Sequence, residues 1–148
     1  MEATLPTVLG AGAGFLLAVL WFDLMFDVQV RRFGDADGDA RLASIADYYR
    51  RVTIEAFPAN RLVATVMLVT IGATLVQWWR APSWRHCLAI ALIVAPVALA
   101  ARRVVPNAMR LGARRDPLPD QRALARQIWR DHVDCLGYVV AFLLVQLA

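Results

Sequence analysis

The chain has 148 residues, of which 59% are hydrophobic and only 19% are charged. A soluble domain keeps roughly a quarter of its residues charged and about half apolar, so this surplus of apolar side chains indicates a solvent other than water. The composition excludes a disordered, collagen-like or disulfide-stapled chain. The length fits one domain over residues 1–148.

The basic residues are all arginines, and the net charge is +4. A basic chain suggests a nucleic-acid partner, but these arginines gather at the ends of apolar runs and alternate with acids instead of forming one basic face. We therefore expect no nucleic-acid partner. Arginines that flank apolar runs are typical of membrane proteins, so the predicted partner is the lipid bilayer.

Four apolar runs follow one another along the chain. Uncharged stretches of 20, 18 and 16 residues end before Asp23, Arg80 and Arg102, and 14 residues follow Asp134. A spanning helix needs about 20 apolar residues, so the first two runs qualify and the last two need their charged flanks at the interface. The runs are continuous rather than alternating, which favours helices over barrel strands. The predicted fold is an all-α integral membrane four-helix bundle with helices over about 6–30, 42–80, 84–111 and 117–147.

Four spans place both termini on one side of the membrane. All arginines except Arg80 and Arg85 fall on the other side. The excess of basic residues in short loops marks the cytoplasmic side. We therefore predict a multi-pass protein of the cell membrane with both termini outside and with its helices extended on the cytoplasmic side.

Three local signals refine the predicted helices. Pro58 predicts a kink where the second helix enters the membrane, and Gly112 is the predicted C-cap of the third. Gly10 and Gly14 have the GxxxG spacing that lets another helix approach closely, so they predict a packing face for a helical partner.

Ionisable side chains collect at the cytoplasmic ends of the predicted helices. Asp23 and Asp27 lie one turn apart on the first helix, while Asp131 and Asp134 share a stripe on the last helix with His132 beside it. Ionisable groups at membrane depth are costly, face the interior and mark functional sites. We expect Asp23 or Asp27 to face the interior and to approach the Asp131–Asp134 stripe or a partner arginine.

The polar residues divide into two predicted sets. If the site is catalytic, His132 is the natural proton carrier, because the unperturbed pKa of histidine is about 6.5. The predicted catalytic residues are Asp23, Asp131, His132 and Asp134. The predicted substrate-binding residues are Asp27, Glu55, Asn60, Asn107 and Arg110. A metal site is not expected, because one histidine among carboxylates without ligand spacing is a weak ligand set. No particular cofactor is indicated.

Two short motifs lie in the second half of the chain. Pro106-Asn107 is followed by Arg110-Leu111, and Trp129-Arg130-Asp131-His132 leads into the last apolar run. In both motifs and in helix spacing the chain resembles the anthrone-oxygenase-like family of small four-helix integral membrane proteins. This resemblance implies the four-helix membrane fold and an oxygenase-like enzyme that acts on a lipophilic small molecule.

Several functions remain open at this point. One alternative to an enzyme is a non-catalytic accessory or interaction subunit. In a purely structural interpretation the aspartates pair with arginines such as Arg102, Arg103, Arg110 or Arg130. A transporter is disfavoured, because the second and third predicted helices have no acidic residue in mid-span. An apolar pocket bordered by the polar residues would favour the enzyme.

Overall fold

The computed structural model describes residues 4–55 and 59–147, and all regular elements within these ranges are helices. They are, in chain order, α1 (Thr4–Asp27), η1 (Val28–Arg32), α2 (Gly38–Arg50), η2 (Arg51–Glu55), α3 (Ala59–Arg80), α4 (Trp84–Leu99), η3 (Ala100–Val104), α5 (Val105–Ala113) and α6 (Leu118–Leu147). The element η1 is a 3-10 helix, whereas η2 and η3 are π-helical turns. The predicted all-α class is confirmed.

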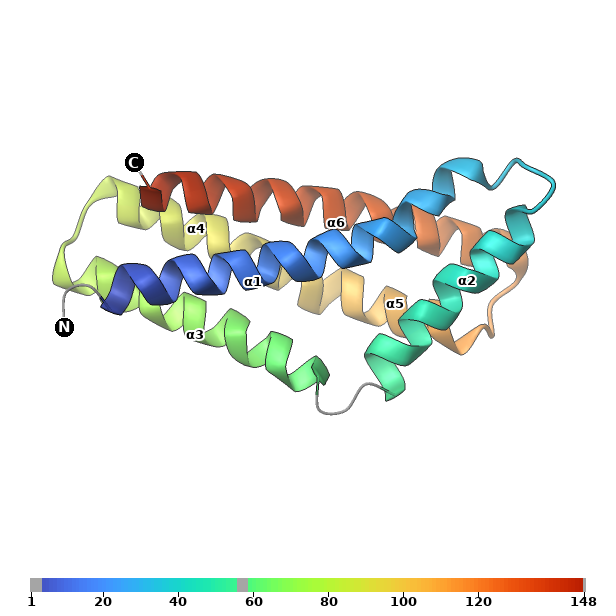
Figure 1. The fold of residues 1–148 in the computed structure, drawn as a ribbon, viewed down its shortest axis with the longest axis horizontal. Coiled ribbons are helices and arrows are strands. Elements are labelled where there is room, and N and C mark those ends of the chain that lie inside the picture. Colours follow the sequence, from blue (N-terminus) through green and yellow to red (C-terminus); the bar gives the residue numbers. More distant parts are fainter. Residues whose placement is uncertain (1–3, 56–58, 148) are drawn as a thin grey trace.

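The helices form two halves of an elongated molecule (Figure 1). In one half, α1, α3, α4 and the end of α6 run side by side, and the first turn of α1 lies near the last turn of α6. In the other half, α2 and α5 pack against each other and against the start of α6. The long helices α1 and α6 pass from one half into the other.

Three helical stretches are long and apolar enough to cross a membrane: Thr4–Arg32, Arg61–Arg80 and Trp84–Ala113. Many of their large apolar side chains are not covered by protein, and Trp79 and Leu68 are 82% and 68% exposed. Contiguous apolar surface of this extent marks a contact with lipid or another protein. The structure is therefore compatible with a membrane protein.

The second predicted helix is divided. Instead of one helix over residues 42–80, α2 ends at Arg50, η2 continues to Glu55, and α3 begins at Ala59. Within the π-helical turn, the hydroxyl of Thr53 donates a hydrogen bond of 2.6 Å to the carbonyl of Tyr49. Such back-bonding competes with the backbone ladder and bends helices. The kink predicted at Pro58 lies outside the described residues.

Two hydrophobic cores hold the molecule together. The core of the α1–α3–α4–α6 half contains Leu9, Ala13, Leu16, Ala89, Ile93, Val139 and Phe142. The core of the other half contains Val30, Phe33, Leu42, Ile45, Ala46, Tyr49, Val104, Ala108, Leu111, Ala125 and Ile128. Because these clusters are separate, the middle of the molecule is the region where packing is incomplete.

The prediction that Gly112 caps a helix is wrong. The left-handed conformation at the end of α5 belongs to Arg114, with φ of 51°. Gly112 lies inside α5, and a Cβ there would stand 2.8 Å from the backbone nitrogen of Arg50. The glycine is explained by the close approach of α2 and α5, which leaves no room for a side chain.

The glycines near the start of α1 differ in their surroundings. A side chain at Gly10 or Gly14, the predicted packing face, would meet no neighbouring element within 4 Å. A side chain at Gly12 would collide with Thr70 of α3. Gly12 therefore mediates the approach of α1 and α3, and the partner predicted for Gly10 and Gly14 stays a prediction.

We expect Gly12→Ala to destabilise the protein by about 1–3 kcal/mol through overpacking. Thr70 is fully buried and its hydroxyl donates to the carbonyl of Val66 at 2.8 Å, so it has little freedom to move away. Gly14→Ala is the matched control, since it gains helix propensity and meets no neighbour. Thermal unfolding of both purified variants measures the difference. Equal stability of the two would contradict the close contact at Gly12.

Candidate functional site

A cavity of about 540 Å³ separates the two hydrophobic cores. Every α-helix and both π-helical turns contribute to its lining, which is mainly apolar. The polar lining residues are Asp23, Tyr48, Tyr49, Thr53, Arg61 and His132. Small-molecule sites typically measure about 300–1,000 Å³ and combine apolar walls with a few polar groups, and this cavity has both properties.

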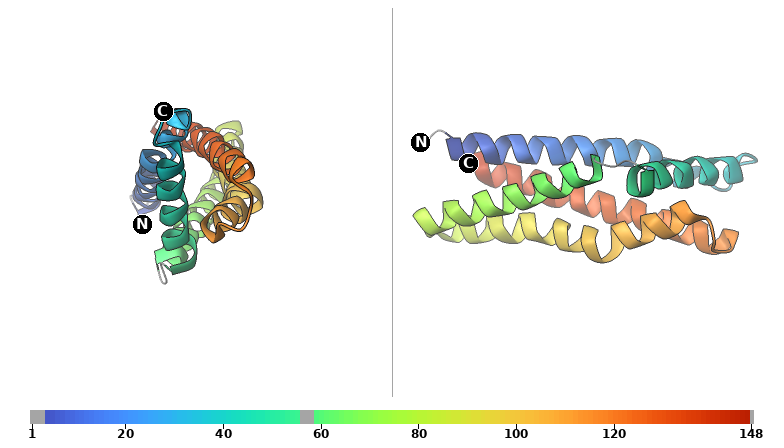
Figure 2. Two further views of the ribbon diagram at one scale, coloured as in Figure 1. Left: turned by 90° about the vertical axis from the view of Figure 1, so that its right-hand side faces the viewer. Right: turned by 90° about the horizontal axis from the view of Figure 1, so that it is seen from below.

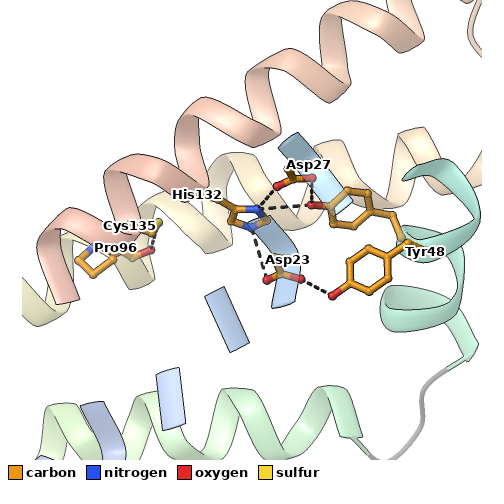
Figure 3. A network of polar contacts seen from close by, with 7 residues as sticks. Asp23, Asp27, Tyr48, Pro96, His132 and Cys135 are labelled. Atoms are coloured by element: carbon orange, nitrogen blue, oxygen red, sulfur yellow. Dashed lines mark hydrogen bonds and ion pairs between the residues drawn. The ribbon is translucent and has the colours of Figure 1, made fainter. Parts of the chain in front are cut away.

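His132 of α6 lies between two aspartates of α1 (Figure 3). Its Nδ1 is 2.6 Å from Oδ2 of Asp27, and its Nε2 is 3.8 Å from Oδ2 of Asp23. Asp27 is fully buried and His132 is 4% exposed. The first and last long helices thus bring their ionisable side chains together in the interior, at the level where the two halves of the molecule meet.

The hydrogen bonds around Asp27 determine which nitrogen of His132 carries a proton. A carboxylate only accepts, and the hydroxyl of Tyr49 donates its single proton to Oδ1 of Asp27 at 2.6 Å. The 2.6 Å contact between Nδ1 and Oδ2 of Asp27 is therefore an Nδ1–H donated to the carboxylate. This leaves Nε2 as the nitrogen able to take up or release a proton.

We infer that Nε2 of His132 faces the cavity. The residues that line the cavity include His132 and Asp23, which approaches Nε2, but not Asp27, which holds Nδ1. Asp27 therefore orients the ring from behind, and the reactive edge of the ring is open to a ligand. A buried carboxylate that holds one imidazole nitrogen while the other acts on a substrate is a recurrent arrangement for general acid–base catalysis.

Two adjacent tyrosines of α2 complete the network. The hydroxyl of Tyr48 donates to Oδ1 of Asp23 at 2.6 Å, and the ring of Tyr48 stacks on Phe26 with centroids 4.1 Å apart. Burial and the neighbouring aspartates raise the pKa of Tyr48 and the pKa of Tyr49 above the usual range of tyrosine. Both hydroxyls therefore stay protonated and act as hydrogen-bond donors to the aspartates.

Asp131 belongs to a separate ion pair. Its Oδ1 is 3.0 Å from the guanidinium of Arg103 and accepts a 2.9 Å hydrogen bond from the amide of Gln127. This matches the structural alternative in which aspartates pair with arginines. Asp23 and Asp27 instead have His132 and the tyrosines as partners.

Four further predicted site residues do not line the cavity. Asp134 is exposed on α6, Arg110 pairs with Asp116 at 3.2 Å, and Glu55 pairs with Arg50 at 3.5 Å. Asn107 is half-buried on α5 and does not line the cavity. Asn60 lies in the first turn of α3, and its side chain is outside the described part of the chain.

Sequence reasoning missed the tyrosines as site residues, although a signal was present. Leu42, Ile45, Ala46 and Tyr49 share the buried face of α2 at helical spacing. A tyrosine on such a face needs a polar partner for its hydroxyl, because buried hydroxyls are almost always hydrogen-bonded. Asp23 and Asp27 were the available acceptors.

No family model, characterised protein or solved structure matches this chain. The site must therefore be interpreted from its own geometry. Among the described residues there is no group of three histidine, cysteine or acidic side chains arranged to hold a metal ion. Asp23 and Asp27 approach opposite nitrogens of His132 and do not converge on one point. This geometry suits proton transfer at the ring better than metal coordination.

Proposed function

We propose that this chain is a multi-pass membrane protein whose cavity binds a lipophilic small molecule and whose His132–Asp27 pair exchanges a proton with it. The observation that carries the proposal is the position of Nε2 of His132 at the polar end of an apolar cavity of about 540 Å³. The apolar walls accommodate the body of the ligand, and the polar groups receive its one polar group.

The proposed membrane placement has four spans, namely the three apolar stretches and the apolar half of α6. Helix α6 packs along α1 and α4, so its apolar half crosses the bilayer if they do. The exposed Trp78, Trp79 and Trp84 around the turn between α3 and α4 fit an interfacial aromatic belt. The arginine-rich half then lies in the cytoplasm, and both termini lie outside.

Apart from the guanidinium of Arg61, which also lines the cavity, the hydrogen-bonding groups around His132 favour a ligand that donates a proton. Both tyrosine hydroxyls already donate to aspartates, and Thr53 donates to a backbone carbonyl. Nε2 of His132 and Oδ2 of Asp23 remain as acceptors facing the cavity. A phenol or another weakly acidic hydroxyl supplies the missing donor. An oxygenase reaction on a lipophilic phenol or anthrone, as the resemblance implies, is one reaction that begins with such a proton transfer.

Binding of an alkyl-substituted nitrophenol to the protein in lipid nanodiscs tests the proposed function, because the phenolate of this probe is coloured. We expect saturable binding with an increase in phenolate absorbance over protein-free nanodiscs at the same pH. Anthrone turnover with oxygen consumption is the parallel assay for the oxygenase reaction. Saturable binding without added phenolate would contradict the acid–base role, and no binding would contradict the ligand site itself.

The orientation in the membrane is tested with the exposed thiol of Cys87, near the turn between α3 and α4. We expect a charged, impermeant maleimide to label Cys87 in intact cells. Ala36→Cys, placed at an exposed position before α2 in a Cys87→Ser background, should react only after the cells are broken. The opposite pattern would mean that the arginine-rich half is outside.

A further inference from the structure

Most residues that line the cavity are buried or half-buried. Of its lining residues, those with exposed side chains are Arg61 and Ala64 on α3 and Val105 on α5. Exposed residues that also line a cavity mark where it reaches the surface. The cavity therefore opens between the first turns of α3 and the start of α5.

The packing of α3 explains why an opening forms there. Helix α3 packs against α1 and α4 but not against α5 or η3. Seen from below, α3 and α4 are close at the turn that joins them and diverge toward the other end, with α6 visible between them (Figure 2). At the closed end, the amide of Gln77 on α3 donates to Gln146 on α6 at 3.0 Å. The space beside α3 is thus closed near Gln77 and open at the first turns of the helix.

The rim of the opening has the chemistry of a membrane interface. Ala64 and Val105 are apolar, and Arg61 places a guanidinium beside them. Arg102 lies on the neighbouring turn η3 and is exposed, whereas the guanidinium of Arg103 pairs with Asp131. Arginines can keep their stems in an apolar phase while their charged ends reach the headgroups. With the orientation proposed above, the opening lies at the cytoplasmic edge of the bilayer core.

We propose that the ligand of the cavity is an amphiphile dissolved in the cytoplasmic leaflet, which enters sideways between α3 and α5 through the opening rimmed by Arg61, Ala64 and Val105. This inference rests on the proposed membrane placement and ligand site. The ligand leaves the bilayer without crossing water, its polar group passes Arg61, and the group then reaches Nε2 of His132. The apolar part of the ligand stays out of water along the whole route, because the walls on both sides of the opening are apolar.

Cys135 provides a reporter inside the cavity that needs no knowledge of the natural ligand. It lines the cavity, is 3% exposed, and becomes the sole thiol in a Cys87→Ser background. The experiment compares N-phenylmaleimide, which partitions into lipid, with a sulfonated, water-confined maleimide, on the full chain in nanodiscs. We expect the lipophilic reagent to label Cys135 at least about tenfold faster, a difference of about 1.4 kcal/mol in barrier.

Tryptophan at the rim should close the route. Ala64→Trp is expected to slow labelling by N-phenylmaleimide about tenfold or more, and Val105→Trp, on the opposite side of the opening, should act in the same way. Leu68→Trp is the matched control, because Leu68 lies one turn from Ala64, is 68% exposed and does not line the cavity. All variants are compared by the labelling rate of the same thiol, Cys135, so its intrinsic reactivity does not affect the comparison.

Two results would overturn the lateral route. Equal labelling by the water-confined reagent would show that the cavity opens to water, and unchanged labelling in both Ala64→Trp and Val105→Trp would show that the route lies elsewhere. Labelling of Cys135 requires neither ligand binding nor proton transfer. If the labelling pattern is as expected but the nitrophenol is not ionised, the proposed function is contradicted and the lateral route is supported. If the nitrophenol is ionised but the labelling pattern is not as expected, the lateral route is contradicted and the proposed function is supported.

Discussion

Replacing Asp27 with alanine is expected to destabilise the protein by about 2–6 kcal/mol, because it removes the acceptor of two buried hydrogen bonds. The carboxylate of Asp27 accepts from both Tyr49 and His132 at 2.6 Å and is fully buried. Its removal leaves two buried donors without an acceptor, and each such donor costs about 1–3 kcal/mol.

The measurement is thermal or chemical unfolding of the purified variant in nanodiscs. Asp134→Ala is the matched control, because Asp134 is an exposed carboxylate at the same level of α6. Asp27→Asn should fall between the two, since an amide oxygen still accepts one hydrogen bond but its NH₂ group then faces a donor. Wild-type stability in Asp27→Ala would mean that the network around His132 does not hold α1, α2 and α6 together.

His132→Asn is expected to reduce proton transfer to or from the bound ligand by about 10²–10⁴-fold, the typical contribution of a general acid–base group. Asparagine places its amide NH₂ close to the position of Nδ1, so the hydrogen bond to Asp27 is retained. It has no atom at the position of Nε2, which is the nitrogen that faces the cavity. The variant should therefore fold and bind the nitrophenol but no longer raise its phenolate absorbance.

His132→Gln is the complementary variant, because it keeps an atom near the position of Nε2 instead of Nδ1. Glutamine reaches the position of Nε2 but leaves Asp27 without its donor, so we expect this variant to lose stability as well as proton transfer. If His132→Asn kept full phenolate formation or turnover, the base would have to be Asp23, the other cavity-facing acceptor. A purely structural role of His132 would change unfolding alone in both variants.

The sequence contained enough information for the helical class and for part of the site. The apolar runs can satisfy their backbone groups only as helices, and the similar depths of Asp23 and Asp27 on the first helix and of the Asp131–Asp134 stripe on the last predicted that the two would approach one another. In the structure Asp27 instead meets His132, which lies beside that stripe, while Asp131 pairs with Arg103 and Asp134 is exposed.

The rest depends on contacts between distant segments that no local pattern records. The side chains of Tyr48 and Tyr49 reach the aspartates because α2 folds back along the end of α1 after a short turn. The cavity lies where α3 diverges from α4 (Figure 2), and the contact of α1 with α3 at Gly12 and Thr70 also joins segments far apart in the chain. Asp134 shares a stripe with Asp131 at helical spacing, yet Asp131 is buried and pairs with Arg103, whereas Asp134 is exposed.

The π-helical turn η3 has a further consequence for helical phase. Residues 84–113 form one uninterrupted helical rod in which a single wider turn, Ala100–Val104, accommodates an additional residue. Since each residue advances an α-helix by about 100°, deleting the exposed Ala101 would convert the wide turn into a regular one and keep the phase of α5, whereas forcing all of these residues into a regular α-helix would rotate everything beyond the turn by about that angle relative to α4. Val104 and Ala108 would then leave the cavity wall, and Gly112 would no longer face Arg50. The additional residue in η3 thus sets the orientation of α5 relative to α4, so that one face of this continuous helix lines the cavity and another contacts α2.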